Sequence, residues 1–362
     1  MLGFDEPCAY HNPKTGLTVL TIVDDMIVRG SRVETDKFYA AMEGKFELKD
    51  PTYLTSDTPL QFIGYDITMH DTVHGPMYNI TQEQSMSLFL HEVGYKAKHI
   101  TTPTVTSGVL YEYTEGLSED QAHRFRSIVG SLNYFSQSTR YDISYAVSRV
   151  SQFMTTPTVG AMMAVDRILA YLAGSVEFGI SNRYVPTEDT VQYYCDSDCG
   201  GSLPYTSRSQ TGYLLMLNHV PVYWHSSKQP KTALNSGTAE IYAMSECLLA
   251  ARVFQYRARD MGIELPQCVL LQADSKTAVS FQRATCMNSR LRGHFSLRQQ
   301  WVQELRDRDR CRVVHVSGQQ QLADMFTKVM RPVAFRLNLN KIRYGVSGRV
   351  ASDPASGTTG PM

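Results

Sequence analysis

A chain of 362 residues is long enough for two or three domains, and 43% apolar residues permit real hydrophobic cores. Lys and Arg (35) balance Asp and Glu (35), so the net charge of zero excludes a global field that attracts nucleic acid; any such attraction must be local. Seven scattered cysteines favour a reducing compartment over a disulfide framework, and no signal peptide or membrane-spanning apolar run of roughly 20 residues is recognisable.

Two β-branched runs near the start of the chain predict a hairpin. Residues 17–23 and 26–28 read as strands, with Asp24 and Asp25 in the turn between them. Adjacent carboxylates in a tight turn fit a metal site, and they also fit an ordinary polar turn. The two residues alone do not decide between these interpretations.

A helical region follows from residue 80. Capping boxes that begin at Thr81 and at Ser118 predict two helix starts, and residues 100–116 are predicted to form a loop. Apolar residues at helical spacing then continue as far as residue 172 and are predicted to form a core.

The remaining elements predict an α/β fold with a mixed sheet. In order they are strands at 190–196, 211–217 and 220–225, a helix from Thr238, a strand at 268–273, a short helix through Ala278 and Phe281, a helix around 297–305, a strand at 311–316 and a last helix containing Asp324.

Four carboxylates stand at separate points of this pattern: Asp196, Glu240, Asp274 and Asp324. Two of them end apolar strands, where a carboxylate is costly unless something neutralises it. Hard divalent ions such as Mg²⁺ take oxygen ligands of this kind. Two such ions, roughly 4 Å apart, would clamp the attacking and leaving oxygens of a phosphodiester. The pattern therefore predicts a shared cation site.

Six motifs in order resemble the ribonuclease H domain that ends the Pol polyprotein of copia-type (pseudovirus) LTR retrotransposons. They are Cys195-Asp196-Ser197-Asp198, Ser207 to Tyr213, Ser226-Ser227-Lys228-Gln229, Ser236 to Ala243, Ala273-Asp274-Ser275 and Leu322 to Lys328. The similarity covers about Leu2 to Tyr344. It implies a ribonuclease H-like mixed sheet with flanking helices, with Asp196, Glu240, Asp274 and Asp324 as the catalytic residues that hold two Mg²⁺ or Mn²⁺ ions.

The N-terminal hairpin and its flanks, Phe38, residues 46–50 and residues 62–67, resemble the second half of a copia-type reverse-transcriptase palm. By this resemblance Asp24 and Asp25 match the metal-binding pair of its Tyr-Val-Asp-Asp motif, although Ile22 stands where the family has tyrosine. The family's other catalytic aspartate has no counterpart in the chain. We therefore expect a truncated palm that does not polymerise DNA by itself.

A basic stretch from Arg283 to Arg312 contains eight arginines against three acids, a local excess of 8 − 3 = +5. Arg290, Arg292, His294 and Arg298 are the candidates for binding the phosphate backbone of a hybrid duplex. The alternative for the arginines is a solvated helix face with i to i+4 pairs. Trp301 is predicted to belong to the core. His294 fits proton transfer or product release, and it fits an ordinary surface position.

The resemblance implies cleavage of the RNA strand of an RNA–DNA hybrid. It divides the chain into a partial palm (1–79), a helical thumb or connection (80–188), a ribonuclease H-like domain (189–332) and a disordered tail (345–362). Two alternatives stay open: a degenerate or captured retroelement product that is a binding scaffold without catalysis, and a fragment of an active reverse-transcriptase polyprotein. The family implies a cytoplasmic, virus-like-particle or nuclear location and no membrane partner; oligomeric state is left open.

Overall fold

The computed structural model describes the chain in six stretches: residues 8–73, 75–95, 100–182, 191–201, 206–275 and 294–344. The short helix predicted through Ala278 and Phe281 and the tail predicted at 345–362 lie outside these residues. Among the residues that the structure describes, no helix combines the length and apolar character needed to cross a bilayer.

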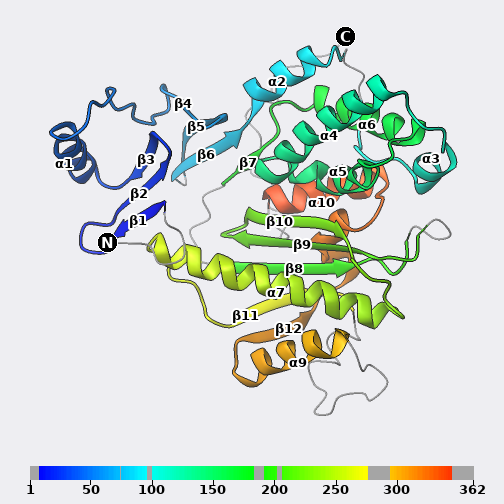
Figure 1. Cartoon of the computed structure of the whole chain (residues 1–362). Helices are drawn as coiled ribbons and strands as arrows, with labels where there is room; N and C mark the ends of the chain where they lie inside the picture. Colours follow the sequence, from blue (N-terminus) through cyan, green and yellow to red (C-terminus); the bar gives the residue numbers. More distant parts are fainter. Residues whose placement is uncertain are drawn as a thin grey trace, which may run out of the picture.

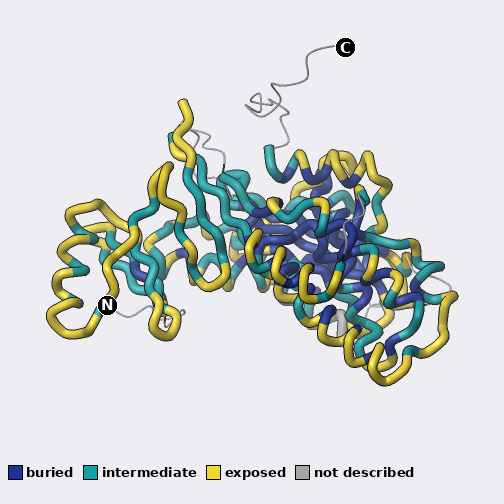
Figure 2. The backbone as a smooth tube through the Cα atoms, turned by 90° about the horizontal axis from the view of Figure 1, so that it is seen from above, coloured by how far each residue is buried: buried dark blue, intermediate teal, exposed yellow. Residues whose placement is uncertain are grey.

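The predicted N-terminal hairpin is confirmed and belongs to a three-stranded antiparallel sheet. Its strands are β1 (Ala9–Asn12), β2 (Leu17–Ile22) and β3 (Asp25–Arg29), with Ile22 opposite Asp25 beside the turn. Helix α1 (Arg32–Glu43) follows and has no buried residue. Figure 2 shows that this end of the molecule is mostly exposed or half-buried, so it contributes little to the core.

A second antiparallel sheet joins segments that are far apart in the chain. Its order is β4 (Leu60–Phe62), β5 (Tyr65–Thr72), β6 (Gly75–Thr81) and β7 (Ile180–Ser181). Strand β7 returns to pair with β6 only after the whole helical region, which fixes both ends of that region to one sheet.

The helical region comprises α2 (Glu83–Glu92), α3 (Ser107–Glu112), α4 (Glu119–Ser138), the 3₁₀ turn η1 (Tyr141–Ile143), α5 (Ser144–Ser151) and α6 (Val159–Ala173). The capping box at Ser118 is confirmed. The one predicted at Thr81 is wrong, because Thr81 pairs in β6 and Asp66 of β5 accepts the free N–H of Gln84 instead. The loop predicted at 100–116 contains helix α3, which packs on α6 through Leu110.

The last sheet has the strand order β10-β9-β8-β11-β12. Its strands are β8 (Val191–Ser197), β9 (Gln210–Leu217), β10 (Val220–Lys228), β11 (Val269–Ala273) and β12 (Cys311–His315). The first three are antiparallel hairpins, and β11 runs parallel to both β8 and β12. Order and direction match the ribonuclease H-like mixed sheet expected from the sequence.

Side chains of β8 and β9 alternate between two hydrophobic cores, as a pleated strand requires. Tyr193 and Leu215 face α7 (Ser236–Asp260) and α9 (His294–Asp307). Figure 1 shows α7 lying across this face of the sheet. Tyr194 and Leu214 face the opposite core, which also contains Phe135 of α4. The helical region therefore covers the second face of the nuclease-like sheet, and residues on both sides of the predicted boundary at 188 share one core.

A helix that the sequence analysis did not include completes this shared core. After the 3₁₀ turns η3 (Gly318–Gln320) and η4 (Leu322–Phe326), helix α10 (Pro332–Tyr344) buries Phe335, Leu339 and Ile342 among residues of the helical region. The last helix expected around Asp324 is thus a short 3₁₀ turn, and the packed chain continues past the predicted domain end at 332 to residue 344.

Candidate metal centre

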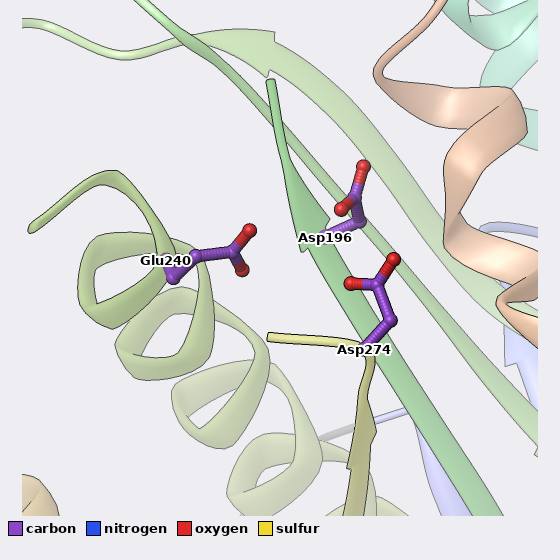
Figure 3. A group of neighbouring side chains, drawn as sticks. All are labelled: Asp196, Glu240 and Asp274. Atoms are coloured by element: carbon purple, nitrogen blue, oxygen red, sulfur yellow. The ribbon is translucent and has the colours of Figure 1, made fainter. Parts of the chain in front are cut away.

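Three of the four predicted carboxylates meet at one edge of the nuclease-like sheet. Asp196 lies on β8, Glu240 in the second turn of α7, and Asp274 directly after β11. Each offers an oxygen that lies within 4.8 Å of those of the other two, and Figure 3 shows the side chains converging. Asp196 and Glu240 are buried, and Asp274 is half-buried.

Local structure explains the convergence. Strands β8 and β11 are parallel neighbours, with Leu271 opposite Tyr193, so both end at the same edge. Helix α7 starts at this edge because the side chain of Asn235 caps it, accepting the N–H of Thr238 at 2.9 Å. That start places Glu240 beside the two strand ends.

The electrostatics of the cluster fit a bound cation. Burial, and then the neighbouring Asp196 and Asp274, raise the pKa of Glu240 to about 9. Among the described residues its Oε2 is buried without a hydrogen-bond partner. A buried, unpartnered carboxylate oxygen next to two more carboxylates is costly unless a proton or a cation neutralises it. The donor set therefore fits a hard divalent metal ion.

Asp324 does not join this cluster of three directly. Its Oδ1 lies 2.8 Å from Nζ of Lys328, and the same ammonium lies 3.2 Å from Oδ2 of Asp196. Burial and Asp196 raise the pKa of Asp324 to about 6, against the opposing effect of Lys328. Burial lowers the pKa of Lys328, and its two carboxylate partners more than offset this, so the pKa stays above its ordinary value.

Two residues in the site were missed as functional candidates. The hydroxyl of Thr327 donates to Oδ2 of Asp196, and Lys328 bridges Asp196 to Asp324. Both stand in the motif from Leu322 to Lys328, so the signal was in the sequence. Their role was not evident because it depends on η4 reaching β8 across more than a hundred residues of chain.

Gly212 allows that approach. It pairs with Asp196 in the β8–β9 ladder, and a Cβ there would lie 2.6 Å from Cβ of Phe326 and 2.7 Å from Cγ2 of Thr327. Contacts this short require the segment after η4 to shift. The absence of a side chain at Gly212 thus lets Thr327 and Lys328 reach Asp196.

We expect Gly212→Ala to destabilise the protein by about 1–3 kcal/mol, the usual range for overpacking a filled site. It should also weaken divalent-ion binding, because the displaced segment carries Asp324 and the hydroxyl of Thr327 that contacts Asp196. Urea denaturation and a Mn²⁺ titration measure both effects. Gly130→Ala on α4, where a Cβ meets nothing within 4 Å, is the matched control. Equal behaviour of the two variants would contradict the role given to Gly212.

The other predicted site residues lie elsewhere. Asp24 and Asp25 are exposed at the β2–β3 turn, and among the described residues no third metal-ligating side chain clusters with them. Arg298 is engaged with α7: it donates to Ser245 at 2.8 Å, pairs with Glu246, and lies over the ring of Tyr242.

Arg290 and Arg292 fall in the part of the chain that the structure leaves undescribed, as does the side chain of His294. Their nucleic-acid role stays a prediction. Trp301 is half-buried against the core under α7, as expected, whereas Leu297 of the same helix is exposed.

Solved structures provide only a faint comparison. A ribonuclease H1 named LC11, determined in complex with an RNA/DNA hybrid, is 12% identical, with 38% of this chain and 94% of that chain covered and a TM-score of 0.30. The order and direction of the strands define the fold of the sheet. No protein-family model matches the chain.

Curated relatives give a stronger result. The Pol polyprotein of transposon RE1 from Arabidopsis thaliana is 34% identical over 247 residues, which cover 68% of this chain and 16% of the relative. That of transposon RE2 from the same plant is 29% identical over 326 residues, covering 90% and 21%. That of transposon TNT 1-94 from Nicotiana tabacum is 26% identical over 344 residues, covering 92% and 25%.

The chain thus spans between about a sixth and a quarter of the length of these relatives. The sequence motifs, the strand order of the mixed sheet and these relatives all agree on one assignment. The homologues of this chain are retrovirus-related Pol polyproteins of copia-type transposons, at up to 34% identity.

Proposed function

We propose that this chain is a metal-dependent ribonuclease that cleaves the RNA strand of an RNA–DNA hybrid. The observation that carries the proposal is the cluster of Asp196, Glu240 and Asp274 at one edge of a ribonuclease H-like sheet. The similarity to Pol polyproteins supports the proposal, although the chain spans only a small part of each of these relatives.

The residues of the site have distinct tasks in this proposal. Asp196, Glu240 and Asp274 would hold a first ion, and Asp196 with Asp324 would hold a second. Bound Mg²⁺ or Mn²⁺ ions supply an activated water and stabilise the leaving 3′ oxygen. Burial raises the pKa of Glu240 to about 9, so its carboxyl group would have to lose a proton in order to hold an ion as a carboxylate. Thr327 orients Asp196 through its hydroxyl.

Selectivity for the hybrid would come from the nucleic acid's own chemistry. The 2′-hydroxyl distinguishes the RNA strand at the cleavage position, and the shape of the duplex distinguishes the hybrid from other helices. The exposed Asp24 and Asp25 are proposed as the metal-binding remnant of a palm and take no part in this cleavage.

The direct test is cleavage of an end-labelled RNA strand annealed to DNA. We expect products with Mg²⁺ or Mn²⁺ and none after chelation with EDTA. The same RNA as a single strand and the corresponding DNA duplex are the controls, and both should stay intact. Tight hybrid binding without any cleavage would instead support the alternative of a scaffold that has lost catalysis.

The predicted basic stretch gives a second test, sharpened by the structure. We expect Arg290→Ala with Arg292→Ala to weaken hybrid binding at every sequence and to flatten the slope of log affinity against log salt by about one per lost phosphate contact. Because Arg298 is already paired with Glu246 and stacked on Tyr242, Arg298→Ala should change the slope less. Slopes that stay unchanged in the double variant would show a solvated helix face.

A further inference from the structure

Lys328 lies in the gap between the two carboxylates that the proposed function assigns to the second metal ion. Its Nζ is 2.8 Å from Oδ1 of Asp324 and 3.2 Å from Oδ2 of Asp196. The side chain of Asp196 is 2% exposed and that of Asp324 21% exposed, so water screens this pair of acids only weakly. The ammonium already supplies the positive charge that the gap requires.

The backbone at Lys328 is anchored beside the two carboxylates, so its side chain starts from a defined place next to them. The N–H groups of Thr327 and Lys328 both donate to the carbonyl of Asp324, at 3.1 and 3.0 Å, and close the end of η4. The Thr327 hydroxyl bonds to the same oxygen of Asp196 that Lys328 contacts. The tight packing of this segment on Gly212 holds the arrangement against β9.

A divalent ion and the Lys328 ammonium cannot share this gap. Mg²⁺ binds carboxylate oxygens at about 2.0–2.1 Å, so an ion on Oδ2 of Asp196 and Oδ1 of Asp324 would sit within a few ångströms of Nζ. Two cations so close, in a partly buried setting, repel each other strongly. The ion can therefore bind only when the lysine side chain leaves, and at 42% exposure it has a path to solvent.

Among the described residues, no lysine or arginine forms an ion pair with Glu240 or Asp274 at the first ion position. Asp196, Glu240 and Asp274 bring three carboxylate oxygens within 4.8 Å of one another, and the contacts of Lys328 and Thr327 with Asp196 both fall on Oδ2. Among the described residues no hydrogen bond or ion pair reaches Oδ1 of Asp196, so this oxygen is available to an ion held by the cluster. The two positions therefore differ in what must move before an ion enters.

From this asymmetry we propose that Lys328 is a resident counter-ion of the second metal position, which a divalent ion must displace in order to bind. The inference rests on the proposed function for the identity of the two positions. It predicts one tight site and one markedly weaker site for a divalent ion in the protein without nucleic acid. The weakness of the second site comes from the energy needed to remove Lys328 from its two carboxylates.

The test is calorimetric titration of the full chain with Mn²⁺ in the absence of nucleic acid. We expect Lys328→Met to tighten the second site at least tenfold and to change the first site much less. Lys328→Arg keeps the charge and should keep the second site weak. Lys37→Met removes a lysine charge on α1, away from the site, and should bind like the wild type. Adding Asp324→Asn to Lys328→Met should abolish the tightened second site.

Isotherms of Lys328→Met that superimpose on those of the wild type would overturn the inference, as would equal tightening by Lys328→Arg. Thermal unfolding gives an independent readout that also reports whether each variant folds. Without metal, Lys328→Met should melt below the wild type because two carboxylates lose their cation, and Mn²⁺ should raise its melting temperature by more. Neither measurement uses hybrid cleavage, so a chain that fails to cleave but shows the expected titrations would refute only the proposed function.

Discussion

Asp196→Asn and Glu240→Gln are each expected to abolish hybrid cleavage while leaving the fold intact. A neutral amide binds a hard divalent cation poorly, and each residue contributes an oxygen to the three-carboxylate cluster. The expected loss in rate is roughly 10³-fold or more, the scale on which removal of a single catalytic group falls. Single-turnover cleavage of a labelled hybrid measures it, with circular dichroism as the check on folding. Cleavage that survives either substitution would show that this carboxylate cluster is not the cleavage site.

Glu240→Gln should also leave a signature in stability that depends on pH. The pKa of Glu240 is about 9 in the folded chain against an ordinary 4.5, so the folded chain keeps a proton that the unfolded chain releases. Stability without metal therefore falls as pH rises from about 4.5 towards 9. In EDTA at pH 8 the glutamine variant should be more stable than the wild type, by an amount on the order of a few kcal/mol. At pH 4 the two proteins should have the same free energy of unfolding, because Glu240 is then protonated in both the folded and the unfolded chain.

With saturating Mn²⁺ the wild type should instead be more stable than Glu240→Gln, because only the glutamate carboxylate is stabilised by binding the ion. Urea denaturation at the two pH values, with EDTA and with Mn²⁺, makes the four measurements needed. If the glutamine variant is no more stable than the wild type at pH 8 in EDTA, the burial of Glu240 does not destabilise the metal-free protein as expected.

The largest expected loss of stability lies away from the site, at Arg140. Its guanidinium pairs with Asp142 at 2.7 Å, both side chains being fully buried, and also donates to the carbonyl and the hydroxyl of Ser175. It thereby ties the η1 turn to the end of α6. Replacing Arg140 with methionine leaves the Asp142 charge buried without its partner, which typically costs about 3–5 kcal/mol.

Urea denaturation checks this expectation, and Arg32→Met is the matched control. Arg32 pairs with Asp36 on the surface of α1, with both side chains about half or more exposed, so its loss should cost less than about 1 kcal/mol. The double variant Arg140→Met with Asp142→Asn should be more stable than the single variant, because no unpaired charge remains. Similar losses for Arg32→Met and Arg140→Met would contradict the role of the buried pair.

The places of Asp196 and Asp274 at strand ends were predictable from the sequence because their signals are local. A carboxylate that follows an apolar run, as at Asp196 and Asp274, marks a strand end, and parallel strands bring their ends to one edge. The stripe of Ile241, Met244 and Leu248 predicted α7 and is buried as expected. Helical periodicity and capping involve residues that are close together in the chain, so both can be recognised in a single sequence.

What the sequence did not predict depends on contacts between distant segments. The cap expected from Thr81 fails because Asp66, on another strand, takes over the free N–H of Gln84. Helix α10 begins with Pro332, a residue suited to the first turn, but its stripe becomes a core only where the helical region lies opposite. The bridge made by Lys328 likewise needs Gly212 on another strand.

The shared core limits how far this chain can be shortened without losing its fold. A shortened protein that starts at residue 189 would keep all five strands of the nuclease-like sheet but would leave Tyr194, Leu214, Met216 and Trp224 without the helices that cover them. Trp224 would also lose the carbonyl of Ser136, to which its indole donates at 2.6 Å. Such a bare apolar face favours aggregation. A shortened version of this chain should therefore keep the helices from α2 onward together with the nuclease-like sheet.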